Sequence, residues 1–382
     1  MLTVDWEIIV LNTYTPRVTA KVDDFIAQIA KQGIADATAW TSYLSFDIMG
    51  DVGLGKDFAG VASGREHPAI KAIHDHMTVL SIGGHVPWLL NLASRIPGCT
   101  AGYAPFFNWC AAELQAKQKT WKSDKQPTDI VSWLIKAQDE NDPTAPPSQA
   151  ALHEDSRVII VAGSETTATT LAAIVFYLAT QPRVYRKLQE YVDAVMPPSS
   201  LGGNNSNWTY EKAKSITYID DIIHETLRLK PALLAGSYRV TPPEGLQIDE
   251  VHVPGDTTVF VPTQQIQTDT RYWAPRAAEF VPERFSQQQE EDHAPSTSAS
   301  AATDTTTIEG SSGPFLPFTL GMHACPGKNL ALMSLRISVS KIAQNFDLSL
   351  APGEDGKHFD NAALETFTTT LPPLRVQFSK RV

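Results

Sequence analysis

One cysteine in this chain has neighbours that would suit it to chemistry. Cys325 lies in a segment with two glycines, Phe318 to Gly327 (FTLGMHACPG), that directly precedes a predicted helix. A cysteine at a helix N-terminus meets unpaired backbone N–H groups and the positive end of the helix dipole, and both favour its thiolate. The thiolate is the form that binds a metal or attacks a substrate, so Cys325 is a candidate for either role.

Several roles for Cys325 stay open at this level. It could be a small buried apolar residue, because free cysteines are among the most buried residue types. It could be a nucleophile with His323 as its partner, whereas zinc is disfavoured because no second cysteine or close histidine pair lies nearby. The aromatic ring of Phe318, with Gly321 and Gly327 to permit close approach of a flat partner, favours a single thiolate ligand to haem iron.

The segment resembles the haem-binding signature of the cytochrome P-450 family, Phe-x-x-Gly-x-(Arg/His)-x-Cys-x-Gly. The resemblance implies that Cys325 is the axial ligand of haem b, within a loop and following helix over residues 314–345. It also implies that Phe318, Gly321 and Gly327 contact the haem. His323 stands where many family members use Arg to pair with a haem propionate.

Residues 162–167 (AGSETT) lie in the longest predicted helix. Alone, an acid followed by threonines is usually a packing feature, because Thr hydroxyls bond to the preceding turn. An ionisable residue in an otherwise apolar helix is costly to bury, however, which favours a functional role. The segment resembles the family's Ala-Gly-x-(Asp/Glu)-Thr-Thr groove over the haem. The resemblance implies that Gly163 leaves room for dioxygen and that Glu165 and Thr166 relay protons.

Glu225 and Arg228 are three residues apart in another predicted helix. Such a pair is usually an exposed ion pair worth ~0.3 kcal/mol. Here it resembles the family's Glu-x-x-Arg, and residues 282–285 (PERF) resemble its downstream partner. The resemblance implies that Glu225, Arg228 and Arg284 form a buried network that holds the cysteine loop. Arg239 is a second candidate for a haem propionate, the alternative being a solvated arginine at a strand start.

The composition narrows the class of protein. The chain has 382 residues, with 42 acidic and 31 basic side chains and a net charge of −11, which argues against a nucleic-acid partner. Hydrophobic residues at 42% exclude wholesale disorder. The three cysteines are too few for a disulfide framework, and Cys99 and Cys110 are expected to be packing residues. The most apolar stretch, Leu171 to Ala179, is shorter than the roughly 20 residues of a membrane span.

The elements that must position these residues are mostly helical. Helices are predicted over residues 22–30, 104–119, 128–137, 148–180 and 328–345. Residues 251–262 predict a hairpin that turns at Pro254-Gly255, and residues 367–378 predict terminal strands around Pro372-Pro373. Residues 286–312 have the composition of a low-complexity surface insert. We expect one domain over residues 1–382, mainly α with a small β portion, with the cytochrome P-450 fold.

The beginning of the chain differs from the family pattern. Tyr14-Thr15-Pro16 resembles the start of the helix usually called D, so we expect an N-terminally truncated form without the anchor, first sheet strands and early helices. Leu44 to Phe58 also resembles fungal small-molecule members. We expect a full-length form on the cytosolic face of the endoplasmic reticulum, and this chain to be cytosolic or peripheral.

The resemblance implies an activity. It indicates a haem-thiolate monooxygenase that inserts one oxygen atom from O2 into a small apolar substrate, in secondary-metabolite biosynthesis. Electrons would come from NADPH-cytochrome P-450 reductase. The alternatives are a truncated, catalytically impaired or non-catalytic haem-binding remnant and, among enzymes, a member that rearranges oxygen or uses peroxide.

Overall fold

The computed structural model describes residues 4–75, 101–122, 126–197, 207–286, 313–366 and 368–381, with a few isolated residues between 86 and 98. The chain divides into two compact units, Met1–Ile219 with Pro326–Val382 (unit 1) and Asp220–Cys325 (unit 2), and each is described by itself. The prediction of one domain over residues 1–382 stays a prediction. Cys99 and residues 287–312 of the predicted insert lie outside the described residues.

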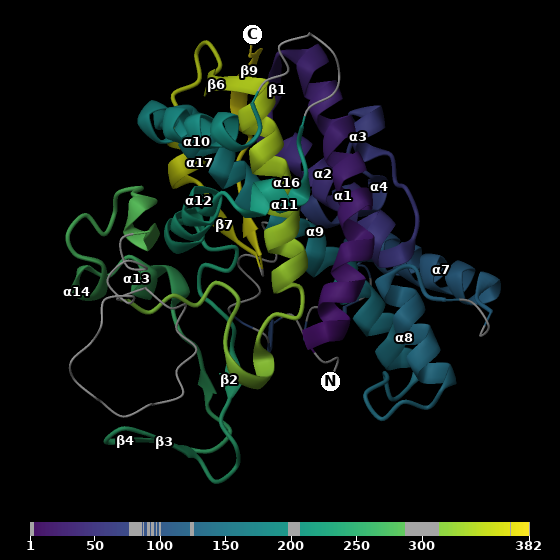
Figure 1. The fold of residues 1–382 in the computed structure, drawn as a ribbon. Helices are drawn as coiled ribbons and strands as arrows, with labels where there is room; N and C mark the ends of the chain where they lie inside the picture. Colours follow the sequence, from purple (N-terminus) through teal and green to yellow (C-terminus); the bar gives the residue numbers. More distant parts are fainter. Residues whose placement is uncertain are drawn as a thin grey trace. The chain divides into compact units, whose positions relative to one another are not determined.

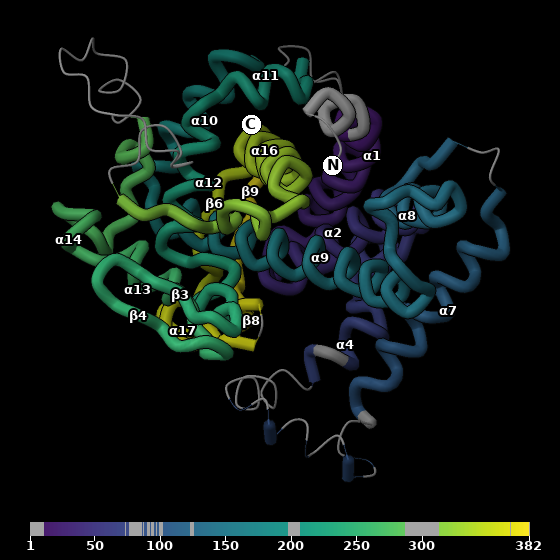
Figure 2. The backbone as a smooth tube through the Cα atoms, turned by 90° about the horizontal axis from the view of Figure 1, so that it is seen from below, coloured from purple at the N-terminus to yellow at the C-terminus, as the bar shows by residue number. Residues whose placement is uncertain are grey.

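Helix α9 (Gln149–Thr180) is the central helix of unit 1. The hydroxyl of Ser148 caps its first turn by accepting from the backbone N–H of Ala151 at 3.1 Å, and the helix ends before Pro182 as predicted. Every residue from 168 to 179 is buried, because helix α2 (Ala37–Met49) and further helices pack around this half (Figure 2). An all-round apolar helix is stable in such a core.

The length of helix α9 differs from what we expected for the most apolar stretch of the chain. Among the described residues, it is the one helix long and apolar enough to cross a membrane, so the expectation that no segment reaches that length was wrong. Of its most apolar stretch, 61% is buried inside the protein. The core helix of a soluble protein has the same length and composition, so this finding is weak evidence for a span.

The other helices of unit 1 surround this core. Helix α1 (Val4–Gln32) packs against α16 (Lys328–Asn345), as Figures 1 and 2 both show. Helix α1 extends well beyond the predicted residues 22–30, whereas α16 has the predicted bounds. The remaining helical segments are η1 (Gly50–Leu54, a π-helix), α3 (Gly60–Ser63), α4 (Pro68–His74), η2 (Ala101–Tyr103), α7 (Ala104–Thr120), α8 (Ile130–Asp139), α10 (Pro182–Val195), α11 (Tyr210–Lys214) and α17 (Lys357–Asn361).

Unit 1 also contains a small antiparallel sheet (Figure 1). Its strand order is β1 (Ile34–Asp36), β9 (Arg375–Lys380) and β6 (Phe346–Leu350). A separate pair joins β7 (Leu364–Glu365) to β8 (Thr369–Thr370). Strands β8 and β9 confirm the predicted terminal strands on either side of Pro372-Pro373. Phe367 lies outside the described residues.

Unit 2 begins within α12 (Thr217–Leu229) and carries two short strand pairs. Strand β2 (Arg239–Val240) pairs with β5 (Thr258–Val259), and β3 (Leu246–Ile248) pairs with β4 (Val251–Val253). Its other helical segments are α13 (Thr263–Gln267), α14 (Thr270–Trp273) and η3 (Gly321–His323).

The predicted hairpin over residues 251–262 was therefore wrong. Pro254-Gly255 turns the chain, but β4 pairs back with β3 and β5 pairs with β2. The reason is a tertiary contact at the turn. The hydroxyl of Thr241 donates to the Pro254 carbonyl at 2.7 Å and accepts from the Thr257 N–H at 3.0 Å. These bonds attach the turn to the chain before it, so the two strands beside the turn do not meet.

Candidate functional site

The cysteine loop of unit 2 is a tight turn that leaves Cys325 exposed. The backbone N–H of Cys325 donates to the Phe318 carbonyl at 2.8 Å, which closes the loop. Gly321 has a φ of +66°, in the left-handed region that favours glycine. His323 is exposed, and its carbonyl accepts from the hydroxyl of Thr319. The structure thus brings the predicted loop residues together through the backbone.

The structure excludes one of the roles considered for Cys325. Cys325 is exposed, so it is not the buried apolar residue that its type most often is, whereas Cys110 is buried and the pKa of its thiol rises to about 12 because of burial. Within the described part of the chain, no three His, Cys, Asp or Glu side chains come together to hold a metal ion. The roles of Cys325 as a single thiolate ligand and as a nucleophile with His323 both stay predictions.

The residues of this loop fit a haem ligated through one thiolate. The free thiol of Cys325 is exposed together with two apolar side chains, Leu320 at 47% and Met322 at 91% exposure. A thiol among apolar groups on a closed glycine turn suits a flat, largely apolar macrocycle with iron at its centre. In unit 1, Gly327 occupies the N-cap of α16 and brings no side chain to that end.

The predicted charge network is present and buried in unit 2. Glu225 and Arg228 are both 0% exposed, and the guanidinium binds the carboxylate through two bonds, Nε–Oε2 at 2.7 Å and Nη2–Oε1 at 2.9 Å. Arg284 Nε donates to Glu225 Oε1 at 3.3 Å, and the Val281 N–H donates to the same oxygen at 2.8 Å. The exposed-pair alternative for Glu225 and Arg228 is therefore wrong.

A residue that sequence reasoning missed joins this network to the cysteine loop. Gln267 is fully buried. Its backbone carbonyl accepts from Arg228 Nη1 at 2.8 Å, its side-chain amide donates to the Leu227 carbonyl at 2.9 Å, and its amide oxygen accepts from the Leu316 N–H at 2.9 Å. Leu316 is two residues before Phe318, so the network reaches the beginning of the loop. A lone glutamine has no local pattern that would have revealed this.

Arg239 stands apart from the network. It is half-buried at the start of β2, and its Nη1 donates to the neighbouring carbonyl of Tyr238 at 2.8 Å. Both the haem-propionate role and the solvated role are compatible with this position. The assignment of Arg239 stays a prediction.

In unit 1, the AGSETT segment lies midway along α9. The hydroxyl of Thr166 donates to the Ala162 carbonyl at 2.7 Å, the back-bond expected of a helical threonine. Gly163 faces α2, where an added Cβ would come within 2.6 Å of the sulfur of Met49. Gly163 therefore has a packing reason to be glycine, in addition to the predicted role in leaving room for dioxygen.

Glu165 has a partner that the sequence did not indicate. Its Oε2 lies 3.1 Å from Nε2 of His74, the last residue of α4, and the other ring nitrogen of His74 contacts Glu66. The Glu165 side chain is only 14% exposed. No motif joins His74 to Glu165, because 91 residues separate them.

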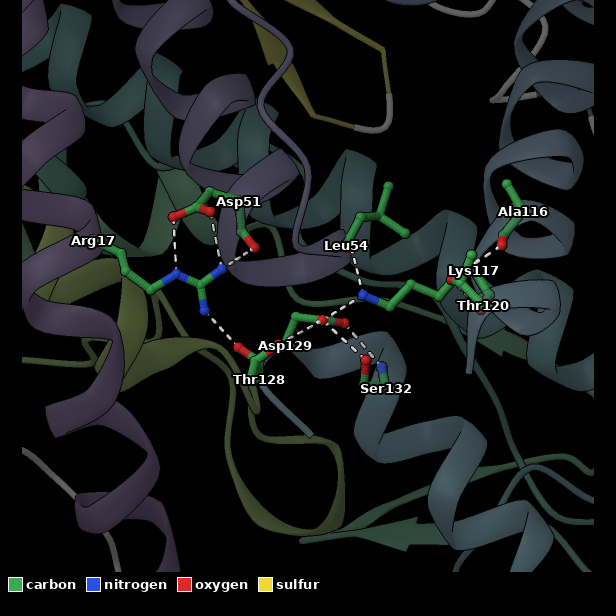
Figure 3. Close-up of polar contacts among 9 residues, drawn as sticks. All are labelled: Arg17, Asp51, Leu54, Ala116, Lys117, Thr120, Thr128, Asp129 and Ser132. Carbon is green, nitrogen blue, oxygen red and sulfur yellow. Dashed lines mark hydrogen bonds and ion pairs between the residues drawn. The ribbon is translucent and has the colours of Figure 1, made fainter. Parts of the chain in front are cut away.

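A second charge cluster, which lies in unit 1, has a structural role (Figure 3). Asp129 is fully buried, caps α8 by accepting from the Ser132 N–H at 2.9 Å, and pairs with Lys117 of α7. Nearby, Arg17 of α1 binds Asp51 of η1 through two bonds of 2.9 Å. Each carboxylate faces a cation on another element, so the cluster joins four elements.

The comparisons with known proteins identify the family. A family model described as cytochrome P-450 matches residues 9–378. This chain belongs to the cytochrome P-450 family. A solved cytochrome P-450 (CYP102L1) superposes with a TM-score of 0.74 at 23% identity, covering 99% of this chain and 79% of that one. The cytochrome P-450 fold predicted from the sequence is confirmed.

Similar cytochromes P-450 come from fungi and are named monooxygenases. The monooxygenase eupD of Phoma sp. is 40% identical over 80% of this chain and all of its own length. The monooxygenase orf5 of Eupenicillium brefeldianum is 32% identical over 97% of this chain and 70% of its own length. A tryprostatin B 6-hydroxylase of Aspergillus fumigatus is 27% identical, and this chain covers 58% of it.

Family membership establishes the general chemistry. The cytochrome P-450 fold implies a haem cofactor, and monooxygenases of this family need O2 and a redox partner. The chain is thus an oxidoreductase of the monooxygenase type.

Proposed function

We propose that this chain is a haem-thiolate monooxygenase that inserts one oxygen atom of O2 into a small apolar organic molecule of fungal secondary metabolism. The substrate class is supported by the fungal origin of the relatives and by a relative named as a hydroxylase of tryprostatin B. The proposed cofactor is haem b, and the proposed electron donor is NADPH-cytochrome P-450 reductase. The proposed location is the cytosolic face of the endoplasmic reticulum, where such a reductase would be met.

One observation carries the proposal: Cys325 is exposed on a loop whose beginning is tied to a buried charge network. An exposed loop by itself would be mobile, because nothing buries it. The bond from Leu316 to Gln267, and from Gln267 to Arg228, connects this loop to fully buried groups. Pre-organisation of a metal ligand by buried hydrogen bonds is the usual way in which a protein tunes such a site.

The residues of the chain have distinct tasks in this proposal. Haem, when bound, supplies the activation of dioxygen, which the protein alone cannot perform. Cys325 provides the thiolate ligand. The macrocycle is contacted by Phe318, Gly321 and Gly327, and its propionates are bound by His323 and Arg239. Thr166 and Glu165 hold and pass protons at the hydroxyl oxygen and the carboxylate. The Thr166 hydroxyl donates its hydrogen bond to the Ala162 carbonyl, so the lone pairs of its oxygen can accept another.

The test is the spectrum of the reduced, carbon-monoxide-bound protein. The chain expressed with haem should show the Soret shift of thiolate ligation, and Cys325→Ser should lose that shift. Cys110→Ser is the matched control, because Cys110 is a buried packing residue and should leave the spectrum unchanged. A wild-type chain without the shift would contradict the proposal.

The non-catalytic remnant is distinguished by the next measurement. If the chain shows the thiolate spectrum but consumes no NADPH with a reductase and a panel of apolar compounds, the remnant is the correct assignment. Product formed with peroxide in place of NADPH and O2 would instead identify a peroxide-using member. Incorporation of ¹⁸O from O2 into a product confirms the monooxygenase.

A further inference from the structure

We propose that His74 is a positioning residue of this monooxygenase, which acts by binding the carboxylates of Glu66 and Glu165 at the same time and so fixes Glu165. The inference rests on the proposed proton relay through Glu165. All three side chains belong to unit 1, with Glu165 on α9, His74 at the end of α4 and Glu66 in the segment before α4.

The geometry around His74 fits a doubly protonated imidazole. Each ring nitrogen of His74 contacts a carboxylate oxygen, Nδ1 that of Glu66 and Nε2 that of Glu165 at 3.1 Å. Ionised carboxylates only accept hydrogen bonds, so both ring nitrogens must carry a proton if both carboxylates are ionised. A neutral imidazole could donate to one of them only. The two contacts therefore fit an imidazolium that donates from both ring nitrogens, one to each carboxylate.

The electrostatics agree with the geometry. Burial acts to lower the pKa of His74, but the hydrogen bonds and charges of Glu165 and Glu66 outweigh burial and raise it to about 10. Among the described residues, two further titratable groups feel the charge of Glu66: Lys71 of α4, and Tyr43 of α2, whose pKa is raised by burial and by that charge. Lys71 pairs with Asp75. His74 therefore keeps its charge throughout the physiological range.

The exposures indicate why Glu165 needs this partner. Glu165 is 14% exposed, whereas His74 and Glu66 are 26% and 27% exposed. A carboxylate with so little solvent contact is costly to bury without a hydrogen-bonding or cationic partner. His74 is the partner that holds the Glu165 carboxylate in one orientation. The more exposed carboxylate of Glu66 contacts the other ring nitrogen of His74.

The first test reads the charge of His74 directly and does not depend on turnover. In protein labelled with ¹⁵N-histidine, reduced and bound to carbon monoxide so that haem is diamagnetic, the His74 ring signals are those absent from His74→Gln. They should stay doubly protonated to pH 9. In Glu165→Gln the pKa should fall by more than about one unit, because an adjacent carboxylate shifts a pKa by 1–3 units. Glu154→Gln, an exposed change on the same helix, should leave it unaltered.

The second test reads the reaction. With His74→Gln, the fraction of consumed NADPH that yields product should fall several-fold, and hydrogen peroxide should rise. Wild-type coupling should be constant from pH 6.5 to 8.5. Glu66→Gln should make coupling fall within that range, because loss of one carboxylate brings the His74 titration closer to neutral pH. A purely structural role would not create such a pH dependence.

The outcomes separate this inference from the proposed function. A protein that takes up haem and turns over, but whose His74 titrates near pH 6.5, overturns the inference alone. A His74 titration as expected with unchanged coupling in His74→Gln also overturns it, because the pair would then position nothing. Failure of haem uptake overturns the proposed function, and the ¹⁵N titration is then read on the chain without haem.

Discussion

Thr166 shares its local geometry with a second threonine of α9, which makes its chemistry testable. The Thr166 hydroxyl donates to the Ala162 carbonyl at 2.7 Å, and the Thr180 hydroxyl donates to the Phe176 carbonyl at 2.8 Å. Alanine at either position removes the same back-bond, so both changes should alter stability equally and by only about 1 kcal/mol. Thr166 alone of the two follows Glu165, the proposed source of protons.

Thr166→Ala should therefore uncouple oxygen consumption from product. Without the hydroxyl, the relay from Glu165 loses the group that passes the proton on. Less product and more hydrogen peroxide should therefore form for each NADPH consumed. Thr180→Ala should keep wild-type coupling, and Thr166→Ser, which retains the hydroxyl, should keep most of it. Identical peroxide yields in Thr166→Ala and Thr180→Ala would remove Thr166 from the proton relay.

At the scale of elements, the sequence predicted what local signals determine. Helix α9 begins after the cap at Ser148 and ends before Pro182, and α16 begins after Gly327, because caps and breakers act on adjacent residues. The hairpin prediction was wrong because a turn signal says where the chain reverses and not which strands pair. Thr241, which redirects that turn, lies thirteen residues before Pro254.

The site residues likewise fall into those that a local motif predicts and those that only the folded structure reveals. Glu225, Arg228 and Arg284 could be predicted as a network because their motifs have fixed spacing. Gln267 and His74 could not, because they act through contacts to Leu316 and Glu165 that only the fold creates. Side chains that support a site through tertiary contacts carry no local pattern, and they are the part of the site that needed a structure.

The buried network of unit 2 should be expensive to break. Arg228→Met leaves Glu225 as a buried carboxylate with only Arg284 as its cationic partner, which should cost about 3–5 kcal/mol. It also removes the bond to the Gln267 carbonyl, so the cysteine loop should loosen and haem should dissociate faster. Thermal unfolding and the rate of haem transfer to apomyoglobin measure the two effects. Arg271→Met, whose exposed ion pair with Asp269 lies in the same unit, should change neither.

For the charge cluster in Figure 3 we also predict a loss of stability, which does not depend on haem. Lys117→Met leaves the fully buried carboxylate of Asp129 without its cation, which should lower the free energy of unfolding by about 3–5 kcal/mol. Lys119→Met, two residues away on α7 and exposed, is the control and should be neutral. Urea unfolding followed by circular dichroism gives both values. A Lys117→Met protein as stable as Lys119→Met would show that the pair contributes nothing.

At the scale of the whole molecule, several acidic side chains of the described residues are buried or nearly so and are paired with cations. The net charge of −11 says nothing of this, because it counts side chains and not their partners. In the described residues, Glu225, Asp129 and Glu165 all have little or no solvent contact, and each faces a cation from another part of the sequence or the same helix. Of these pairs, the one that involves His74 should make stability depend on pH.

His74 gives that dependence a direction. Its pKa is 6.5 as the unperturbed value and about 10 in the folded protein, so the folded state binds the proton more tightly. The stabilisation is complete below pH 6.5 and is lost as the pH rises through 10. Between these values the wild-type free energy of unfolding should fall with pH, relative to His74→Gln, by at most about 1.4 kcal/mol per pH unit.

Urea unfolding of wild type and His74→Gln at pH 6, 7.5 and 9 measures this difference, because other groups that titrate in the range are common to both proteins and cancel. The gap between the two should be widest at pH 6 and should narrow steadily towards pH 9. His358→Gln, an exposed histidine on α17, should run parallel to the wild type at each pH. A gap that is constant across the three pH values would mean that His74 binds its proton equally in the folded and unfolded chain, and the bridge between Glu66 and Glu165 would then not exist in solution.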